Sequence, residues 1–471
     1  MPNLKRREFL GVLGAGAAAA TWGTRPRAAG AAEGGDTPAP RRPNVLFLLS
    51  DDQRYDTIAC MGNPIIKTPN LDALVAAGTV FTNPYIQGGT GGAICVCTRS
   101  MVMTGRTIWH SPDNMGTAFP LWPEVMQRAG YHTHGIGKWH NGAPSYARCF
   151  MSGGPIFFGG MTNQSKVPVH DFDPSGKYPK SAERTAEQPS SELFSDAAVQ
   201  FLRGYKEEKP FFLYVAYTSP HDPRTAPEPF ASMYDPGKIP LPLNFMPEHP
   251  FDNGELKGRD EKLAPWPRTP EVVRRHIADY YAMISHLDRE VGRVLAALDE
   301  TGRAKDTIVI FAGDNGLALG QHGLFGKQSV YEHSVRVPLI MRGPGVPAGQ
   351  KRDAFVYLLD LYPTVCGMAG VAVPDTVEGK SLVPVLADPK PRVRETVFAA
   401  YRDLQRMVRD ERWKLIRYSV KGEKRTQLFD LAADPWETKD LSADPACAAT
   451  LESMGAKLRA WQEQTGDKRV L

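Results

Sequence analysis

Apolar and polar positions follow two different patterns along the first two thirds of the chain. Short apolar runs alternate with longer stretches in which apolar residues recur every three or four positions. Runs of the first kind predict buried strands, and stretches of the second kind predict amphipathic helices. The predicted strands are PNVLFLLS (43–50), YHTHGIGKWH (131–140), PFFLYVAYT (210–218) and DTIVIFAGDN (306–315).

The predicted helices lie between these strands. They are TPNLDALVAAG (68–78), PLWPEVMQRAG (120–130), SSELFSDAAVQFLRGY (190–205) and the long stretch 270–301. Strands that alternate with helices predict an α/β fold with a doubly wound, mostly parallel central sheet flanked by helices.

The pattern changes after about residue 370. The segments 395–403, 405–419 and 426–435 alternate apolar and polar residues between charged turns, and a last helix is predicted from about 446 to 464. Such alternation is typical of an antiparallel sheet with one covered face. We therefore expect a main domain at 43–370 and a smaller α+β subdomain at 371–471.

The first 42 residues differ from both parts. Lys5-Arg6-Arg7-Glu8-Phe9-Leu10 is followed by the run GVLGAGAAAATW, a pattern similar to a twin-arginine signal peptide. We expect a signal peptide at 1–32 and a linker at 33–42. The run is too short and too rich in alanine and glycine to span a bilayer well, so no membrane anchor is expected after processing. The predicted location is periplasmic or secreted, reached through the twin-arginine export machinery.

Composition narrows the class of protein. With 471 residues, of which 42% are hydrophobic, the chain can bury a large core without disulfides. Its six cysteines are too few and too scattered for a disulfide framework. The formal net charge is +4 and no basic block stands out, so we expect no nucleic-acid partner.

Two predicted strands end in polar pairs, Asp51-Asp52 and Asp314-Asn315. In open α/β sheets, ligands bind beyond the carboxyl ends of the strands. Oxygen ligands from two such ends suit a hard divalent cation such as Ca²⁺ or Mg²⁺. Either pair alone is more often a turn or a helix cap.

The stretch GGAICVCTRSMVMTGR (91–106) carries the chain's most specific chemistry. TRSMVMTG predicts a short helix that ends at Gly105. Cys95 then lies at or just before the helix N-terminus, where free N–H groups favour anions. Arg99, one turn later, adds a permanent charge on the same side. Taken in isolation, the motif also fits a buried thiol beside a surface arginine.

Further candidates for an anion site follow along the chain: Lys138, His140, His221, His322 and Lys327. In an extended segment Lys138 and His140 share one face. His221 lies between prolines, a stiff mounting for a proton donor. His322 and Lys327 lie on a glycine-rich loop that can approach a ligand closely. Alone, each is more often an exposed lysine or a histidine that bonds to a loop.

Together these motifs resemble the formylglycine-dependent sulfatases over residues 43 to about 435. The family signature C-x-P-S-R followed by T-G matches Cys95, Arg99, Thr104 and Gly105, whereas Cys97 replaces the proline and Thr98 the serine. The other supporting stretches, in family order, are NVLFLLSDDQRYDT, TPNLDAL, GIGKWH, SPHDP, FAGDNG, GLFGKQSVYEHSVRVPLIMRGPG, DLYPTVCGMAGV, RMVRDERWKLIRY and LFDLAADPWE.

The resemblance implies an alkaline-phosphatase-like fold and hydrolysis of sulfate esters. It implies that a maturation enzyme oxidises Cys95 to formylglycine, which in its hydrated form attacks sulfur. By resemblance Arg99 orients this residue and His140 is the base that releases sulfate. The implied sulfate-binding set is Lys138, His221 and Lys327, with His221 and Lys327 supporting the leaving alcohol. The implied ligands of Ca²⁺ (or Mg²⁺) are Asp51, Asp52, Asp314, Asn315 and the modified residue 95.

Three functions remain open at this point. The leading interpretation is an active sulfatase. A phosphonate monoester or phosphodiester hydrolase of the same superfold would use the same metal cradle. Because Cys97 departs from the maturation motif, an unmodified protein that binds sulfated glycans is the third. The long loops 143–190 and 222–268 are expected to form the pocket rim, and their size favours a sulfated carbohydrate as substrate.

Overall fold

The computed structural model describes residues 42–469. The predicted signal peptide (1–32) and nearly all of the predicted linker (33–42) therefore lie outside the described residues. Within the described part of the chain, none of the helices combines the length and the apolar character that a bilayer crossing requires.

The core of the molecule is an eight-stranded sheet with the order β11-β2-β10-β9-β1-β8-β4-β5. All neighbouring strands run parallel except β10, which is antiparallel to both β9 and β2. The strands are β1 (Asn44–Ser50), β2 (Thr79–Tyr85), β4 (His132–Lys138), β5 (Ser152–Phe157), β8 (Phe211–Ala216), β9 (Thr307–Gly313), β10 (Leu339–Arg342) and β11 (Gln350–Tyr357). The predicted doubly wound, mostly parallel sheet is confirmed.

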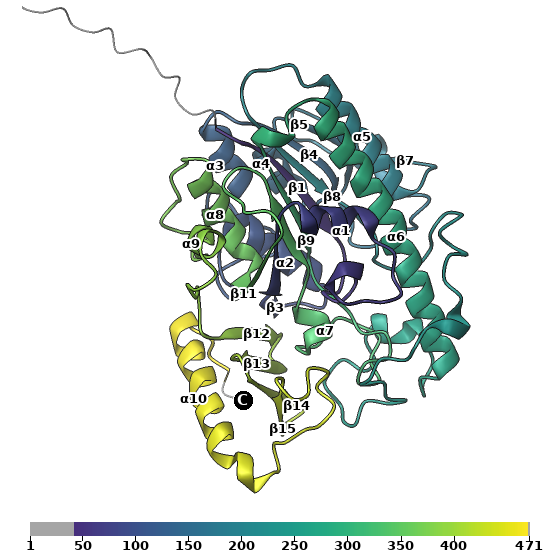
Figure 1. Cartoon of the computed structure of the whole chain (residues 1–471), viewed down its shortest axis with the longest axis vertical. Helices are drawn as coiled ribbons and strands as arrows, with labels where there is room; N and C mark the ends of the chain where they lie inside the picture. Colours follow the sequence, from purple (N-terminus) through teal and green to yellow (C-terminus); the bar gives the residue numbers. More distant parts are fainter. Residues whose placement is uncertain (1–41, 470–471) are drawn as a thin grey trace, which may run out of the picture. The chain divides into compact units, whose positions relative to one another are not determined.

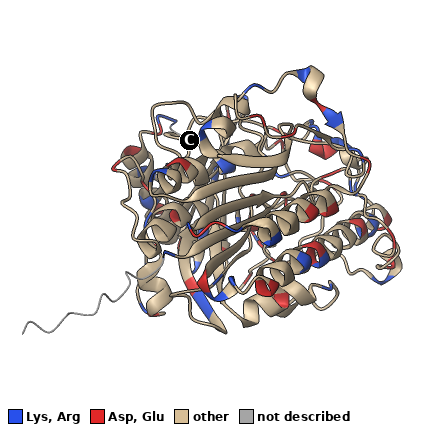
Figure 2. Ribbon diagram, turned by 90° about the horizontal axis from the view of Figure 1, so that it is seen from above, with Lys and Arg blue, Asp and Glu red and all other residues tan. Residues whose placement is uncertain are grey.

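Helices cover both faces of this sheet (Figure 1). On β1, the side chains of Val45, Phe47 and Leu49 join one core cluster, whereas Leu46 and Leu48 join the other. The first cluster includes residues of α2 (Ile94–Thr104), α3 (Trp122–Arg128), α4 (Ala143–Cys149), α8 (Leu361–Met368) and α9 (Val383–Ala387). The second includes residues of α1 (Pro69–Ala76), α5 (Ser190–Gly204) and α6 (Pro270–Glu300). Acidic and basic residues are intermixed along the helices (Figure 2).

A second, five-stranded sheet has the order β15-β14-β13-β12-β3. Four of its strands, β12 (Val397–Tyr401), β13 (Gln405–Arg409), β14 (Trp413–Val420) and β15 (Glu423–Asp430), form an antiparallel meander beside α10 (Ala448–Thr465) (Figure 1). The fifth, β3 (Gly88–Gly89), pairs in parallel with β12 and comes from the first part of the chain. The predicted antiparallel sheet with a last helix is confirmed, whereas the domain boundary at 370/371 stays a prediction. The remaining strands are β6 (Pro168–Val169) and β7 (Arg184–Thr185), and the remaining α-helix is α7 (Glu332–Val335).

Candidate active site

The two polar pairs predicted at strand ends lie next to each other. β1 and β9 are parallel neighbours, and Ser50 pairs with Gly313 at their carboxyl ends. The backbone N–H of Asp52 donates to Asp314 Oδ1 at 3.0 Å. The amide of Asn315 donates to Asp52 Oδ1 at 2.7 Å. The four side chains therefore form one buried cluster at the edge of the sheet.

Cys95 lies over this cluster, at the N-terminus of α2. It is the second residue of the helix, which begins at Ile94 and so starts four residues earlier than predicted, and ends at Gly105 as predicted. The buried Cys95 Sγ lies 3.3 Å from His140 Nδ1 and 3.7 Å from Lys138 Nζ. Together with an oxygen of Asp51 and one of Asp314, it forms a group of potential ligand atoms within 4.8 Å of one another.

Arg99, one turn after Cys95 in α2, connects this helix to the acidic cluster. Its Nε donates to Asp314 Oδ2 at 2.9 Å, and its Nη1 donates to the carbonyl of Lys138 at 2.7 Å and to the Tyr214 hydroxyl at 3.3 Å. The guanidinium is fully buried. Sequence reasoning missed Tyr214, because within the apolar run of β8 no signal distinguishes it from a core aromatic residue.

Two lysines bind the aspartates directly. Lys138 forms an ion pair with Asp51, and Lys327 Nζ lies 2.6 Å from Asp52 Oδ1. Burial and the neighbouring Asp314 raise the pKa of Asp51 above its ordinary value, against the pull of Lys138. Burial disfavours the charge on Lys327, but Asp52 outweighs it and holds the pKa of Lys327 well above its ordinary value.

The two histidines of the cluster are held neutral. Burial, helped by Lys138 and Arg99, lowers the pKa of His140 far below its usual range. Burial also lowers the pKa of His221 well below its usual range, although Asp52 opposes the shift. His221 Nδ1 lies 2.9 Å from the carbonyl oxygen of Asp222, so Nδ1–H donates there and Nε2, 3.6 Å from Asp52 Oδ2, carries the lone pair.

The cluster fits a hard divalent cation. Asp51 Oδ1 and Asn315 Oδ1 are buried oxygens without a hydrogen-bond partner among the described residues. Buried polar oxygens are normally satisfied, and a cation satisfies several at once. The raised pKa of Asp51 also fits a cation, because three carboxylates share one buried space. A cation between them would remove the free-energy cost of keeping these carboxylates charged.

His322 and Cys97, both discussed in the sequence analysis, lie apart from this cluster. The ring of His322 stacks on Tyr331 at 4.0 Å, and its Nε2 faces the Asn244 amide at 3.1 Å. Its glycine-rich loop thus brings Lys327 but not His322 to the site, because stacking turns the imidazole into the core. Cys97 Sγ faces the Thr90 hydroxyl and the Ala93 carbonyl, each at 3.7 Å, on another side of the helix from Cys95.

A cavity of about 390 Å³ opens above the cluster. Cys95, His140 and Lys327 line its floor. The rim is formed partly by the loops predicted for this role, which contribute Met161 and Arg259 among other residues. It also contains Arg402, from the turn after β12, which sequence reasoning missed because nothing in the local pattern links that turn to Cys95.

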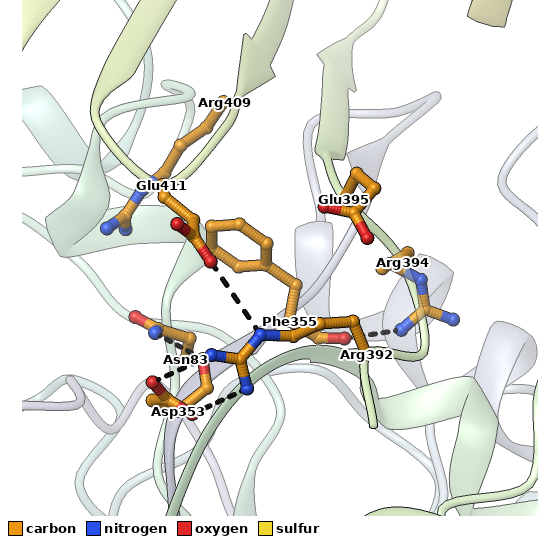
Figure 3. Close-up of a pocket in the computed structure, with 8 residues that line it drawn as sticks. All are labelled: Asn83, Asp353, Phe355, Arg392, Arg394, Glu395, Arg409 and Glu411. Carbon is orange, nitrogen blue, oxygen red and sulfur yellow. Dashed lines mark hydrogen bonds and ion pairs between the residues drawn. The ribbon is translucent and has the colours of Figure 1, made fainter. Parts of the chain in front are cut away.

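A second cavity, of about 300 Å³, lies between β11 and the C-terminal sheet (Figure 3). Arg392 binds Asp353 at 2.8 Å and lies 3.7 Å from Glu411. Arg394 donates to the carbonyl of Phe355 at 3.1 Å. These arginines already bind carboxylates or backbone, whereas the potential nucleophile Cys95 lines the cavity of about 390 Å³, so the cavity above Cys95 is the candidate active site.

Comparison with known proteins agrees with this placement. The sulfatase family model matches residues 43–371, which include every member of the cluster. The chain belongs to the sulfatase family. In this sulfatase, a second model, described as N-sulphoglucosamine sulphohydrolase, C-terminal, matches residues 320–464 and so includes the turn that carries Arg402.

Individual relatives span nearly the whole sulfatase. It is 27% identical over 449 residues to an arylsulfatase of Clostridium perfringens, with 85% of this chain and 90% of the relative covered. It is 28% identical over 474 residues to an N-acetylglucosamine-6-O-sulfatase of Bacteroides thetaiotaomicron, with 86% and 82% covered. A solved structure, in complex with its substrate D-glucosamine-2-N,6-O-disulfate, matches with a TM-score of 0.72 at 22% identity, covering 91% of this chain and 99% of that one. The likeness in structure confirms the fold of the family.

Proposed function

We propose that this sulfatase hydrolyses sulfate esters of carbohydrates, with a formylglycine made from Cys95 as nucleophile and a bound divalent cation, Ca²⁺ or Mg²⁺. One observation carries the proposal. The Cys95 thiol lies at a helix N-terminus between a neutral histidine and a lysine, directly over buried carboxylates. A structural cysteine needs none of these neighbours, whereas a nucleophile that attacks an anionic ester needs all of them.

The residues of this cluster fit both the divalent cation and a formylglycine at position 95. The cation would be held by Asp51, Asp52, Asp314, Asn315 and residue 95, and when bound it neutralises charge on the sulfate oxygens. Formylglycine supplies, in its hydrated form, a hydroxyl as nucleophile and a second hydroxyl through which sulfate can be released.

Residues of the chain position residue 95, accept its proton and bind the sulfate. Arg99, fixed by Asp314 and the Lys138 carbonyl, holds residue 95 in position. His140, neutral because of burial and its cationic neighbours, accepts a proton at Nδ1 from the group on residue 95. Lys138 and Lys327 bind oxygens of the sulfate ester through charge-assisted hydrogen bonds.

The leaving alcohol needs a proton donor. Lys327 stays protonated because Asp52 holds its pKa well above the ordinary value, so it can donate from Nζ. His221 has its Nδ1–H engaged by the Asp222 carbonyl and a bare Nε2. We therefore propose Lys327 as the donor and His221 as an acceptor for a hydroxyl of the substrate next to the leaving oxygen.

A carbohydrate substrate is supported by the relatives and by the pocket. An N-acetylglucosamine-6-O-sulfatase and a structure with a bound glucosamine disulfate are among the proteins that the chain resembles. A cavity of about 390 Å³ falls within the usual range of small-ligand sites and accommodates a saccharide unit. We also propose export by the twin-arginine machinery to the periplasm or beyond, on the evidence of Arg6-Arg7 and the apolar run after them.

The test is a substrate screen with protein that has been co-expressed with a formylglycine-generating enzyme. Sulfated mono- and oligosaccharides, an aryl sulfate, a phosphonate monoester and a phosphodiester are compared at equal concentration by kcat/KM. The proposal expects a sulfated saccharide to be the best substrate and Cys95→Ala to be inactive on it. A phosphonate monoester or phosphodiester as the best substrate would favour the sister activity of the fold. Binding of sulfated glycans without turnover of any ester would favour the binding protein.

A further inference from the structure

We propose that Arg402, together with Arg259, forms a rim that recognises a second anionic group on the substrate beside the scissile sulfate. The substrate class would then be doubly anionic saccharides, which carry a carboxylate or a second sulfate. This inference rests on the proposed function, because both arginines flank the cavity above Cys95. Each belongs to a segment that the sulfate-binding cluster does not use.

Both arginine side chains are partly exposed at the cavity mouth, whereas the carboxylates that pair with them are largely buried. Arg259 is 46% exposed, whereas its partners Asp222 and Asp260 are 6% and 9% exposed. Arg402 is 44% exposed and its partner Glu255 is 14% exposed. An approaching substrate therefore meets the positive member of each pair first.

The contacts of Arg402 leave donors available. Its Nη1 donates to Glu255 Oε1 at 2.6 Å, and the same oxygen accepts from the Tyr401 hydroxyl at 2.8 Å. The Nη2 group faces Gly92, where an added β-carbon would lie only 2.9 Å away. Since a guanidinium has five N–H donors in a fixed fork, Arg402 can bind an anion while it stays paired with Glu255.

The second sheet delivers Arg402 to this place. Ala400 and Tyr401 pair with Gly88 and Gly89, and the backbone N–H of Arg402 donates to the Gly89 carbonyl at 2.8 Å. Six residues after Gly89 the chain reaches Cys95. Arg402 has a φ of 44°, a conformation that costs free energy in a residue other than glycine and that often marks a functional position.

Arg259 reaches the mouth from the loop that also carries Glu255, the partner of Arg402. Its two Nη atoms bind the Asp222 oxygens at 2.6 and 2.7 Å, and its Nε binds Asp260 at 2.9 Å. Asp222 follows His221, so this pair connects the rim to the sulfate-binding cluster. Asp260 also accepts from the Gln328 amide at 2.8 Å, next to Lys327. Arg259 is thus tied through its partners to segments that carry residues of the sulfate-binding cluster.

The test uses aryl sulfates that differ in one charge. The 3- and 4-carboxyphenyl sulfates are compared with the corresponding carbamoylphenyl sulfates, which have nearly the same shape but are neutral at that position. Benzene-1,3-diyl disulfate supplies the arm with a second sulfate. The measured quantity is the ratio of kcat/KM for the charged ester to kcat/KM for the neutral one. Leaving-group effects cancel when this ratio is compared between variants.

We expect the wild-type ratio to exceed that of Arg402→Gln by about three- to fivefold, the factor typical of a partly exposed ion pair. Arg402→Lys should retain part of the preference, and Arg259→Gln should lose a similar share. Arg412→Gln is the matched control, because Arg412 is an exposed arginine of the same sheet that pairs with Asp430 outside the cavity. A preference for the carboxylate alone would indicate a uronic acid, and one for the second sulfate alone a disulfated sugar.

Two failures can be told apart. If the esters are turned over but Arg402→Gln keeps the wild-type ratio, the rim proposal is wrong and the proposed function stands. If mature protein neither hydrolyses any sulfate ester nor binds one, measured by calorimetry with Cys95→Ala, the proposed function is wrong and the rim proposal falls with it.

Discussion

Gly88 is where the second sheet meets the loop before Cys95, so replacing it tests how strongly the two parts depend on each other. Its φ is +83°, and an added β-carbon would lie 2.0 Å from the carbonyl oxygen of Ala400. Gly130 is a matched control, with a φ of +92° and nothing within 4 Å of its β-carbon position. Comparing Gly88→Ala with Gly130→Ala therefore separates the steric clash from the backbone conformation.

The structure gives the size of the difference. A left-handed conformation costs an alanine roughly 1–2 kcal/mol, which both variants share. Relieving the clash at Gly88 requires β3 to move away from β12. That movement breaks the hydrogen bonds from Ala400 N–H to the Gln87 carbonyl (2.9 Å) and from Arg402 N–H to the Gly89 carbonyl (2.8 Å). At about 1 kcal/mol each, their loss adds roughly 2 kcal/mol, so Gly88→Ala should cost about 3–4 kcal/mol in total.

Urea denaturation measures this difference, and kcat/KM for the best sulfate ester measures its effect on the site. Gly88→Ala should lower both, because β3 positions Arg402 and the loop that leads to Cys95. Gly130→Ala should lower only the free energy of unfolding. Equal losses of stability in the two variants, or full activity of Gly88→Ala, would refute the coupling between the sheets.

Three further predictions follow from the cluster, the core and the N-terminus. A chelator should lower the melting temperature of the wild-type protein, since a cation at a hundredfold excess over its Kd adds about 2.7 kcal/mol to the free energy of unfolding. Asp314→Ala should be inactive, and its melting temperature should not change with chelator. Identical wild-type melting curves with and without chelator would count against the cation. Burial lowers the pKa of His249 to about 4 and that of His322 to about 3, so both stay neutral in the folded protein but protonate near pH 6.5 when it unfolds. The free energy of unfolding should therefore fall between pH 6.5 and 4 by about 1.4 kcal/mol per pH unit for each histidine. In His322→Gln this slope should be smaller by the share of one histidine, and an unchanged slope would show that the assignment is wrong. Replacing Arg6-Arg7 by Lys-Lys should leave folded protein in the cytoplasm, and normal accumulation in the periplasm would exclude the twin-arginine signal.

The sequence predicted the parts of the fold that depend on local patterns. The strands at 44–50 and 307–313 follow from apolar runs that end in polar pairs, and their parallel pairing brings those pairs together. The start of α2 was predicted too late, because Ile94-Cys95-Val96-Cys97 carries no polar N-cap. Its N-cap, Ala93, provides no side-chain hydrogen bond.

What the sequence did not reveal depends on contacts between distant segments. β3 is only two residues long, and its pairing with β12 joins positions about 310 residues apart, which no local pattern encodes. The role of Arg402 at the rim follows from that pairing alone. His322 shows the converse: its loop reaches the site as predicted, but the ring stacks on Tyr331 at 4.0 Å and leaves only Lys327 facing the cluster.

The central claim is that residue 95 becomes the nucleophile by oxidation, and the mass of one peptide tests it most directly. Tryptic cleavage after Lys67 and Arg99 yields residues 68–99, which contain both Cys95 and Cys97, so fragmentation must locate the change. We predict that active protein from its natural host carries at position 95 a mass lower by about 18 Da, the difference between a CH₂–SH group and an aldehyde, and that Cys95→Ala is inactive. Active protein in which both cysteines are unmodified would contradict the account.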